Sequence, residues 1–317
     1  MSLTLIRKDP HTFKTLPLFV EATPDGLSYQ GFGQPLNFAE MLERRQAVDV
    51  GDSQRFAVEL ANLGVSVRLT LSWRGRDYWL LVRQRRQDRG DVVLKLISGY
   101  VPAQELNLPL LTAVQEVAEE CLLETPEGWL TGRFGETWLP TPYEHILRYR
   151  ENVQFRLSPL SGAARPVRCG QQPLLERPRA YVHLPTASLQ LVYDLNLQLP
   201  KEARQLSLYH ADEHLEGEQL VARLDRARPD LYLIPLEQGR PTAELLTLQQ
   251  GVLTPASTRG LWLAESFAAQ DGWLVRDEHI RWKDWVSQQN LRPTAPKQSS
   301  TGAPPGMPPK LDAAQPG

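Results

Sequence analysis

The chain has 317 residues, 41% of them hydrophobic and 23% charged, and a formal net charge of −2. This composition is typical of a globular protein with one large or two ordinary domains. The near-neutral charge excludes a global basic field that would attract nucleic acid or an acidic membrane. There is no apolar run long enough for a signal peptide or a membrane span, and two cysteines are too few for a disulfide framework. We therefore expect a cytoplasmic protein that binds neither membrane nor nucleic acid.

The first 50 residues precede the first clear hairpin and are expected to form an N-terminal extension. Short apolar segments on either side of a Pro-Asp-Gly turn predict strands at Leu16–Glu21 and Leu27–Gln30. Asn37 is a good N-cap residue, which predicts a short helix from there through Arg45.

A hairpin is predicted next, because apolar and polar side chains alternate with a period of two. The expected elements are a brief helix over Phe56–Gly64, strands at Val65–Trp73 and Tyr78–Arg83, and a further strand at Val92–Ile97.

Four arginines lie within the seven residues from Arg83 to Arg89. One interpretation is a charged hairpin loop. The other is that one or two guanidinium groups bind substrate phosphates, because arginine offers paired donors that match phosphate oxygens. Arg83, Arg85 and Arg86 are the candidates for this phosphate-binding role.

The stretch from Pro109 to Glu124 predicts a helix with two chemically different faces. At about 100° per residue, its apolar side chains fall in one arc, made up of Leu110, Leu111, Val114, Val117, Ala118 and Cys121. Glu116, Glu119 and Glu120 fall in a narrow arc opposite. Carboxylates so close repel one another unless a cation lies among them, and Mg²⁺ is a natural candidate because it takes oxygen ligands. A solvated acidic face is the alternative interpretation.

The same region resembles the Nudix box, the motif of the Nudix hydrolase superfamily, which reads G-x5-E-x7-R-E-U-x-E-E-x-G-U with U an aliphatic residue. Gly99 and Glu105 reproduce its opening, and Gln115 to Leu123 reproduces its close with two substitutions. Gln115 stands where the motif has Arg, Leu122 stands where it has Gly, and the spacer after Glu105 has nine residues in place of seven. The hairpin and strand upstream follow the order of elements expected before a Nudix helix.

The resemblance implies an α/β (α+β) fold, with a mixed sheet sandwiched between helices. It also implies a metal-dependent hydrolase that cleaves a pyrophosphate bond in a nucleoside diphosphate linked to another moiety. Glu116, Glu119 and Glu120 would hold Mg²⁺ or Mn²⁺, and Glu116, Glu120 and Glu105 would be catalytic, with Gly99 in the loop. In the family the motif's Arg helps hold the first glutamate of the helix. Its replacement here favours the alternative function, a catalytically degenerate nucleotide-binding or regulatory protein.

Downstream, the aromatic-rich segment 126–172 is long for a simple connection, and we expect either a lid or base-binding insertion or a satellite core. Further strands are predicted at Leu189–Leu199, Leu206–Tyr209, Leu231–Leu236 and Leu245–Leu248.

Acidic side chains and two histidines, His210 and His214, gather after the second of these strands. Histidines four residues apart would suit a metal site on a helix, but a loop is expected here. Because Nudix proteins commonly recruit one more carboxylate from a later loop, an acid from residues 210–216 is expected to reach the metal of the acidic helix.

The C-terminal part of the chain is expected to end in a docked helix and a tail. Trp282 and Trp285 share a helix face, which predicts packing onto the domain. Residues 291–317 are rich in Pro, Ser, Gly and Ala and predict a disordered tail. The sequence thus predicts an extension at 1–50, a Nudix-like domain at 51–290 and a tail.

Overall fold

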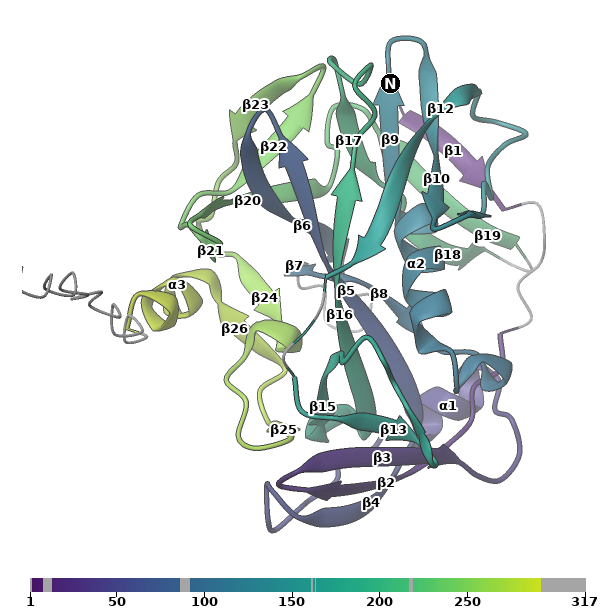
Figure 1. Cartoon of the computed structure of the whole chain (residues 1–317), viewed down its shortest axis with the longest axis vertical. Helices are drawn as coiled ribbons and strands as arrows, with labels where there is room; N and C mark the ends of the chain where they lie inside the picture. Colours follow the sequence, from purple (N-terminus) through teal and green to yellow (C-terminus); the bar gives the residue numbers. More distant parts are fainter. Residues whose placement is uncertain are drawn as a thin grey trace, which may run out of the picture.

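The computed structural model describes residues 2–7, 13–85, 92–160, 162, 164–216 and 219–291 (Figure 1). These residues form 26 strands, three α-helices and three short 3-10 helices. No helix among them is long and apolar enough to cross a membrane. The expected α/β fold, with a sheet sandwiched between helices, is wrong, because multi-stranded sheets dominate the molecule.

The physical reason is a shortage of amphipathic helices. A sheet sandwiched between helices needs apolar helix faces on both of its sides. Of the described helices, α2 (Pro109–Glu120) is the one that packs on the central strands, against β5 (Asn62–Trp73) and β8 (Ile97–Tyr100). The brief helix predicted at 56–64 is also wrong. Its alternating Phe-Ala-Val-Glu-Leu sequence forms β4 (Phe56–Leu60), and β5 begins two residues later.

The long strands β5 and β16 (Ser188–Gln198) lie side by side in parallel at the middle of the molecule (Figure 1). Their register runs without interruption from Asn62 opposite Ser188 to Leu71 opposite Leu197. The leucine and valine side chains of both strands are almost completely buried. Each contributes about 1.5–3 kcal/mol to folding, so this pair anchors the main core.

The predicted hairpin is confirmed, and β5 is its first strand. The two short strands that follow the hairpin pair with different strands of it. β6 (Arg76–Arg85) follows a two-residue turn and pairs with β5. β7 (Val92–Lys95) pairs with β6, whereas β8 pairs with β5. The single strand predicted at Val92–Ile97 is therefore split at Leu96, and the exchange of partners brings both short strands close to α2.

The same large sheet contains most of the strands that follow α2. These are β9 (Cys121–Thr125), β10 (Gly128–Phe134), β11 (Thr137–Trp138), β12 (Tyr149–Pro159), β15 (Arg179–His183), β17 (Ser207–His210), β20 (Leu231–Glu237), β21 (Arg240–Pro241), β22 (Leu246–Gln249), β23 (Val252–Pro255), β24 (Trp262–Ala264), β25 (Leu274–Val275) and β26 (His279–Arg281). β9 pairs antiparallel with β17, so Cys121 lies opposite His210. This pairing brings the segment after β17 to the acidic end of α2.

Two smaller sheets include the N-terminal strands. The first has the order β14 (Gln172–Pro173), β13 (Val167–Cys169), β3 (Gly26–Gly31), β2 (Leu18–Thr23) and β4. The second has the order β1 (Ser2–Ile6), β19 (Gln219–Asp225) and β18 (Glu213–Glu216). Two strands of the expected N-terminal extension, β1 and β3, thus pair with strands from much later in the chain, β19 and β13.

The remaining helices are short. α1 (Phe38–Arg44) begins after its N-cap residue Asn37, which forms a capping box with Glu40. The predicted helix start is therefore confirmed. α3 (Trp282–Leu291) buries Trp282 and Trp285, as expected of a docked helix. The 3-10 helices are η1 (Ala103–Glu105), η2 (Leu184–Thr186) and η3 (Glu265–Phe267). Beyond residue 291, the predicted tail lies outside the described residues.

The aromatic-rich segment 126–172 contributes largely to the interior. Trp129 and Tyr143 pack with Tyr209 in a second hydrophobic cluster, and Phe155 belongs to the main core. Trp129 and Tyr143 therefore pack as a satellite core would, and Phe155 joins the main core. Trp138 is half exposed, beneath the Arg133 guanidinium.

Candidate functional site

The apolar face of α2 packs on the sheet and thereby fixes the direction of its acidic face. Val114 and Val117 are completely buried in the main core. Leu111 is 41% exposed, so the apolar arc is narrower than predicted. The helix ends at Glu120, earlier than the predicted end, because the backbone is extended at Cys121 and β9 begins there.

Glu116 lies over the backbone of Gly99 in β8. A Cβ atom at position 99 would lie 1.8 Å from Glu116 Oε1, so the carboxylate occupies the space that a larger residue would need. Glu116 is partly buried and forms no ion pair with the part of the chain that the structure describes. Burial raises its pKa well above the usual value, and the nearby Glu120 and Glu119 raise it further against the opposing effect of Lys95.

Arg7, which follows β1, joins two carboxylates from different parts of the chain. Its guanidinium donates to both oxygens of Glu119, and its Nη1 lies 3.1 Å from Glu213 Oε2. The other carboxylate oxygen of Glu213 accepts a hydrogen bond from the Tyr143 hydroxyl. Burial raises the pKa of Glu119 above its usual value, although Arg7 opposes the shift.

Glu120 lies between a lysine and a histidine. The distance from Lys95 Nζ to Glu120 Oε1 is 3.7 Å, and that from His210 Nε2 to Glu120 Oε2 is also 3.7 Å. These distances are too long for hydrogen bonds. Burial opposes ionisation of Glu120, but Lys95 and His210 outweigh it and lower the pKa of this carboxyl.

His210 is only 3% exposed, and neither of its ring nitrogens has a hydrogen-bond partner among the described residues. The same holds for Glu120 Oε2, which is buried beside it. Buried polar atoms are rarely left without a partner. The His210 and Glu120 pair therefore offers unused donor and acceptor capacity at the acidic end of α2.

Asp212 adds a further carboxylate next to His210. We define the acidic cluster as Glu116, Glu119, Glu120, Asp212 and Glu213. Burial raises the pKa of Asp212, against the opposing effects of His210 and Lys95. The five carboxyl groups of the cluster face two permanent cations, Arg7 and Lys95, so the cluster carries an excess of negative charge when ionised.

The donor chemistry of the acidic cluster suits a divalent cation, but its geometry as described does not complete a coordination shell. Carboxylate oxygens are preferred by Mg²⁺ and Mn²⁺, and a neutral imidazole is a common metal ligand. Within the described ranges, however, no group of three or more His, Cys, Asp or Glu side chains is placed to hold a metal ion. Coordination would therefore require side chains to move, with the ammonium of Lys95 leaving Glu120.

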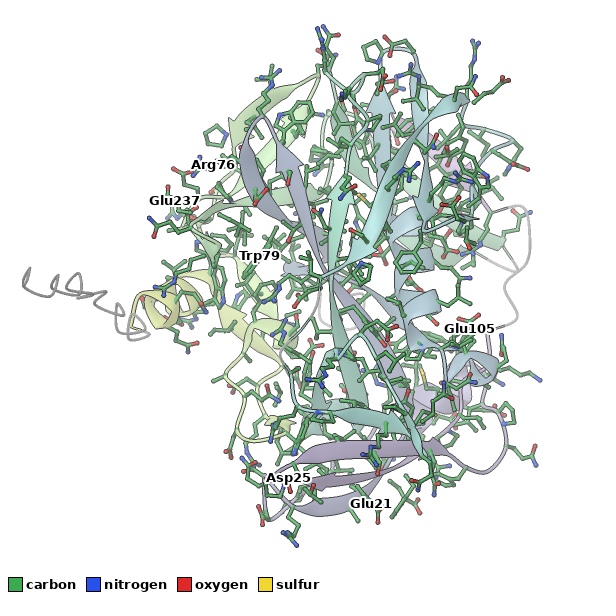
Figure 2. All side chains as sticks on the ribbon, viewed as in Figure 1. Glu21, Asp25, Arg76, Trp79, Glu105 and Glu237 are labelled. Carbon is green, nitrogen blue, oxygen red and sulfur yellow. The ribbon has the colours of Figure 1, made fainter. Side chains whose placement is uncertain are left out.

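Two other predicted site residues have structural contacts of their own. Glu105 accepts a 2.7 Å hydrogen bond from Thr112 and lies beside the N-terminal half of α2 (Figure 2). At 1.5 Å per residue, Thr112 is about 6 Å along the helix from Glu116 and about 12 Å from Glu120, so Glu105 holds the start of the helix, at the opposite end from Glu120. Arg83 lies in β6, and its Nη1 is 3.2 Å from Asp230 Oδ1, so this guanidinium already has a carboxylate partner. The side chain of Arg85 and the whole of Arg86 lie outside the described residues.

The structure also brings in residues that sequence reasoning missed. Arg7 and Tyr143 come from segments with no motif, and only the three-dimensional pairing of β1, β18 and β19 shows their position. Lys95 had a detectable signal, because it is a lone charge in the apolar run Val92–Ile97. Among the acids of residues 210–216, Asp212 lies near Glu120 and Glu213 shares Arg7 with Glu119; that one of them reaches a metal stays a prediction.

Two surface pockets lie away from the acidic cluster. One, of about 690 Å³, lies at the far end of the β9 and β17 pair and includes the ion pair between Glu124 and Arg226. The other, of about 320 Å³, lies beside the turn between β5 and β6. Neither of these pockets is lined by a residue of the acidic cluster.

Comparison with protein-family models and with curated protein sequences finds no match. The similarity to the Nudix superfamily therefore rests on the residues between Gly99 and Leu123 and remains a prediction.

Replacing Gly99 by alanine should displace Glu116, because the new methyl group would occupy the space of its carboxylate. The free energy of unfolding should fall by about 1–3 kcal/mol, the usual cost of overpacking. Gly51→Ala is the matched control, since a Cβ there would meet no atom within 4 Å. Denaturant unfolding of both variants tests this, and equal stabilities would contradict the placement of Glu116.

Glu116→Gln should stabilise the cation-free protein, and by more at neutral than at acidic pH. The folded-state pKa of Glu116 lies well above the unfolded value of about 4.5, so folding favours its protonated form. That stabilisation is present below pH 4.5 and is lost as the pH rises through the folded-state pKa. Glutamine cannot ionise and avoids the loss. Thermal melting in EDTA from pH 4.5 to 8 measures the difference; a difference that stays constant or shrinks with rising pH would contradict it.

Proposed function

We propose that the acidic cluster binds a divalent cation, Mg²⁺ or Mn²⁺, and that the protein hydrolyses a pyrophosphate bond in a nucleoside diphosphate linked to another moiety. The observation that supports this proposal best is the combination of excess carboxylate with the buried, partnerless His210 and Glu120 atoms. A solvated acidic face would not place a partnerless imidazole against the helix. We also propose that the protein is cytoplasmic, and its composition, which is typical of a globular protein, supports this location.

In this proposal Glu116, Glu120 and His210 hold the cation. A bound divalent cation would neutralise charge on phosphate oxygens and lower the pKa of a water molecule. The roles of the remaining residues follow from their contacts. Arg7, which follows β1, fixes Glu119 and Glu213. Gly99 leaves room for the Glu116 carboxylate.

Lys95 balances charge while the cation is absent. Its ammonium lies 3.7 Å from Glu120, and its partly buried side chain cannot easily leave the carboxylates without a replacement charge. A divalent cation would provide that replacement. Cation binding is therefore expected to displace the ammonium from Glu120 rather than to add to it.

A specific observation favours a second function, the binding of a nucleotide without hydrolysis. Arg7 and Lys95 already pair with Glu119 and Glu120, and the described side chains do not complete a metal shell. In this second function the cluster is a fixed charge network. Gln115 and Leu122, which depart from the Nudix motif, fit it as well.

The test is incubation of the purified protein with ADP-ribose, dinucleotides and nucleotide sugars, with Mg²⁺ or Mn²⁺, followed by product analysis. Hydrolysis of at least one compound is expected with cation and none with EDTA. Equilibrium binding is measured in parallel on the same panel. Saturable binding without turnover would support the second function, and neither binding nor turnover would overturn both.

A further inference from the structure

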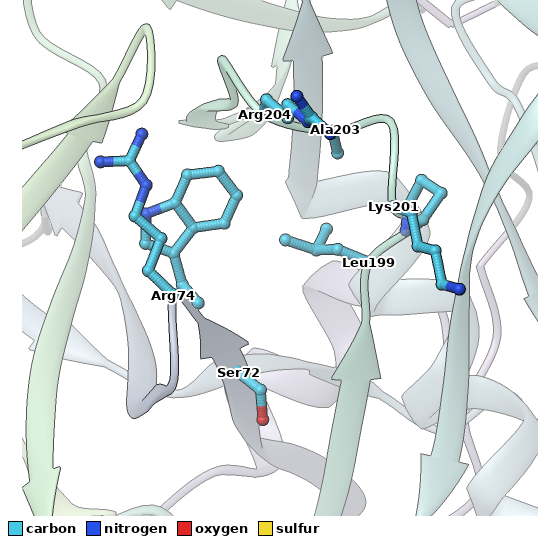
Figure 3. A pocket seen from close by; sticks show the side chains of 8 residues that line it. Ser72, Arg74, Leu199, Lys201, Ala203 and Arg204 are labelled. Carbon is cyan, nitrogen blue, oxygen red and sulfur yellow. The ribbon is translucent and has the colours of Figure 1, made fainter.

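A pocket of about 320 Å³ opens between the turn that joins β5 to β6 and the segment after β16 (Figure 3). Arg74 comes from the turn, and Lys201 and Arg204 come from the later segment. Trp73, Leu199 and Ala203 provide apolar surface between them. Figure 3 shows Leu199 between Arg74 and Lys201, with Arg204 above it in this view. The pocket thus combines positive charge at its edge with an apolar interior.

The three cations of this pocket have no carboxylate partner in the part of the chain that the structure describes. None of them forms an ion pair within the described ranges. By contrast Arg76, two residues after Arg74, lies 3.2 Å from Glu237 (Figure 2). Unpaired cations that gather around one cavity attract an anion.

Arg74 is the first residue of a two-residue hairpin turn, and the turns at Gln238-Gly239 and Gln250-Gly251 have the same pair of left-handed residues. The φ of Arg74 is 50° and that of Gly75 is 78°, so both residues of the two-residue hairpin turn are left-handed. Asn, Asp and Gly are favoured at the first position of such a turn, and Arg is strained there. The guanidinium carbon lies 5.2 Å from the centre of the Trp73 ring. On another side Gly251 leaves room, since a Cβ there would lie 3.3 Å from Arg74 Nη2.

We infer that this pocket binds a small organic phosphate, with the phosphate on Arg74 and Arg204 and its apolar part against Trp73 and Leu199. A guanidinium presents parallel donors that match phosphate oxygens. The cavity volume lies at the lower end of the range of about 300–1,000 Å³ for ligand sites, which suits a ligand of one ring or less. The inference does not depend on the acidic cluster, because no residue is shared.

The test is titration with phenyl phosphate by calorimetry, in EDTA and at constant ionic strength, so that a failure of cation binding elsewhere cannot affect it. Saturable binding at one site per chain is expected, and inorganic phosphate should bind at least about fivefold more weakly because it lacks the apolar part. Arg74→Asn and Arg204→Gln should each weaken phenyl phosphate binding at least about tenfold. Arg259→Gln, at an exposed position on another loop, is the matched control and should leave it unchanged.

Arg74→Asn also separates a ligand-binding role from a structural role. Asparagine suits the left-handed turn better than arginine, so the melting temperature should be unchanged or higher while binding is lost. No saturable binding at millimolar phenyl phosphate would overturn the inference. Equal affinity in wild type and Arg74→Asn, or equal affinity for phenyl and inorganic phosphate, would overturn it as well.

Discussion

Replacement of Arg7 by methionine should lower the free energy of unfolding by about 2–3 kcal/mol, because it leaves Glu119 and Glu213 without the cation that they share. The effect should be smaller than that of a fully buried pair, since the three side chains are 14–18% exposed. Methionine keeps most of the side-chain volume, so loss of charge dominates. Urea or guanidinium unfolding measures the change.

The matched control is Arg223→Met, which removes an arginine that is 65% exposed and pairs with Glu216. Exposed ion pairs contribute about 0–1 kcal/mol, so this variant should remain close to wild type. Adding Glu119→Gln to Arg7→Met should recover part of the lost stability, because it removes an unpaired carboxylate. If Arg7→Met and Arg223→Met cost the same, Arg7 does not organise the acidic cluster.

Glu120→Gln should reduce cation-dependent hydrolysis by at least about 100-fold, because loss of a metal ligand removes several kcal/mol of charge stabilisation. In the cation-free protein the same change should also destabilise the fold, since Lys95 loses the carboxylate beside it. Hydrolysis rates and melting curves in EDTA measure the two effects. Full activity in the variant would exclude Glu120 as a ligand.

Glu116→Gln and Glu120→Gln are therefore expected to have opposite effects on the stability of the cation-free protein. Repulsion between carboxylates three or four residues apart on a helix would by itself predict a slight stabilisation in both variants. The structure changes that expectation for Glu120, which forms an ion pair with Lys95. It does not change it for Glu116, which forms no ion pair among the described residues. Stabilisation by both changes would show that Lys95 does not pair with Glu120 in solution.

Much of the secondary structure could be predicted from the sequence, because it is determined locally. Alternating apolar and polar residues predict β16, β17 and the strands of the hairpin, whose turn residues mark the connection. Capping chemistry predicts the helix start at Asn37. The segment Phe56–Gly64 was predicted as a helix even though its Phe-Ala-Val-Glu-Leu part alternates as a strand does. The predicted helix extends to Glu124, beyond the observed end of α2, because the residues from Cys121 to Leu123 continue the apolar pattern of the helix. In the structure these residues pair with β17 as a strand.

The fold was not predictable from that local information. It was inferred from a resemblance confined to one loop and one helix, whereas the arrangement of the sheets depends on pairings between distant segments, such as β1 with β19 and β5 with β16. The acidic face of α2 and the approach of the 210–216 segment were expected from sequence. Arg7 and Tyr143 were not, because their contacts with Glu213 form only when β19 pairs with both β1 and β18.

The central claim is that the acidic cluster binds a divalent cation, and titration with Mn²⁺ tests it most directly. Binding is followed by loss of the free-ion electron paramagnetic resonance signal in wild type, Glu116→Gln and the control Glu136→Gln, whose side chain is 92% exposed. The account predicts one site per chain with submillimolar affinity in wild type and the control, weakened at least about tenfold in Glu116→Gln. No binding to wild type at millimolar Mn²⁺, or equal binding to Glu116→Gln, would contradict it.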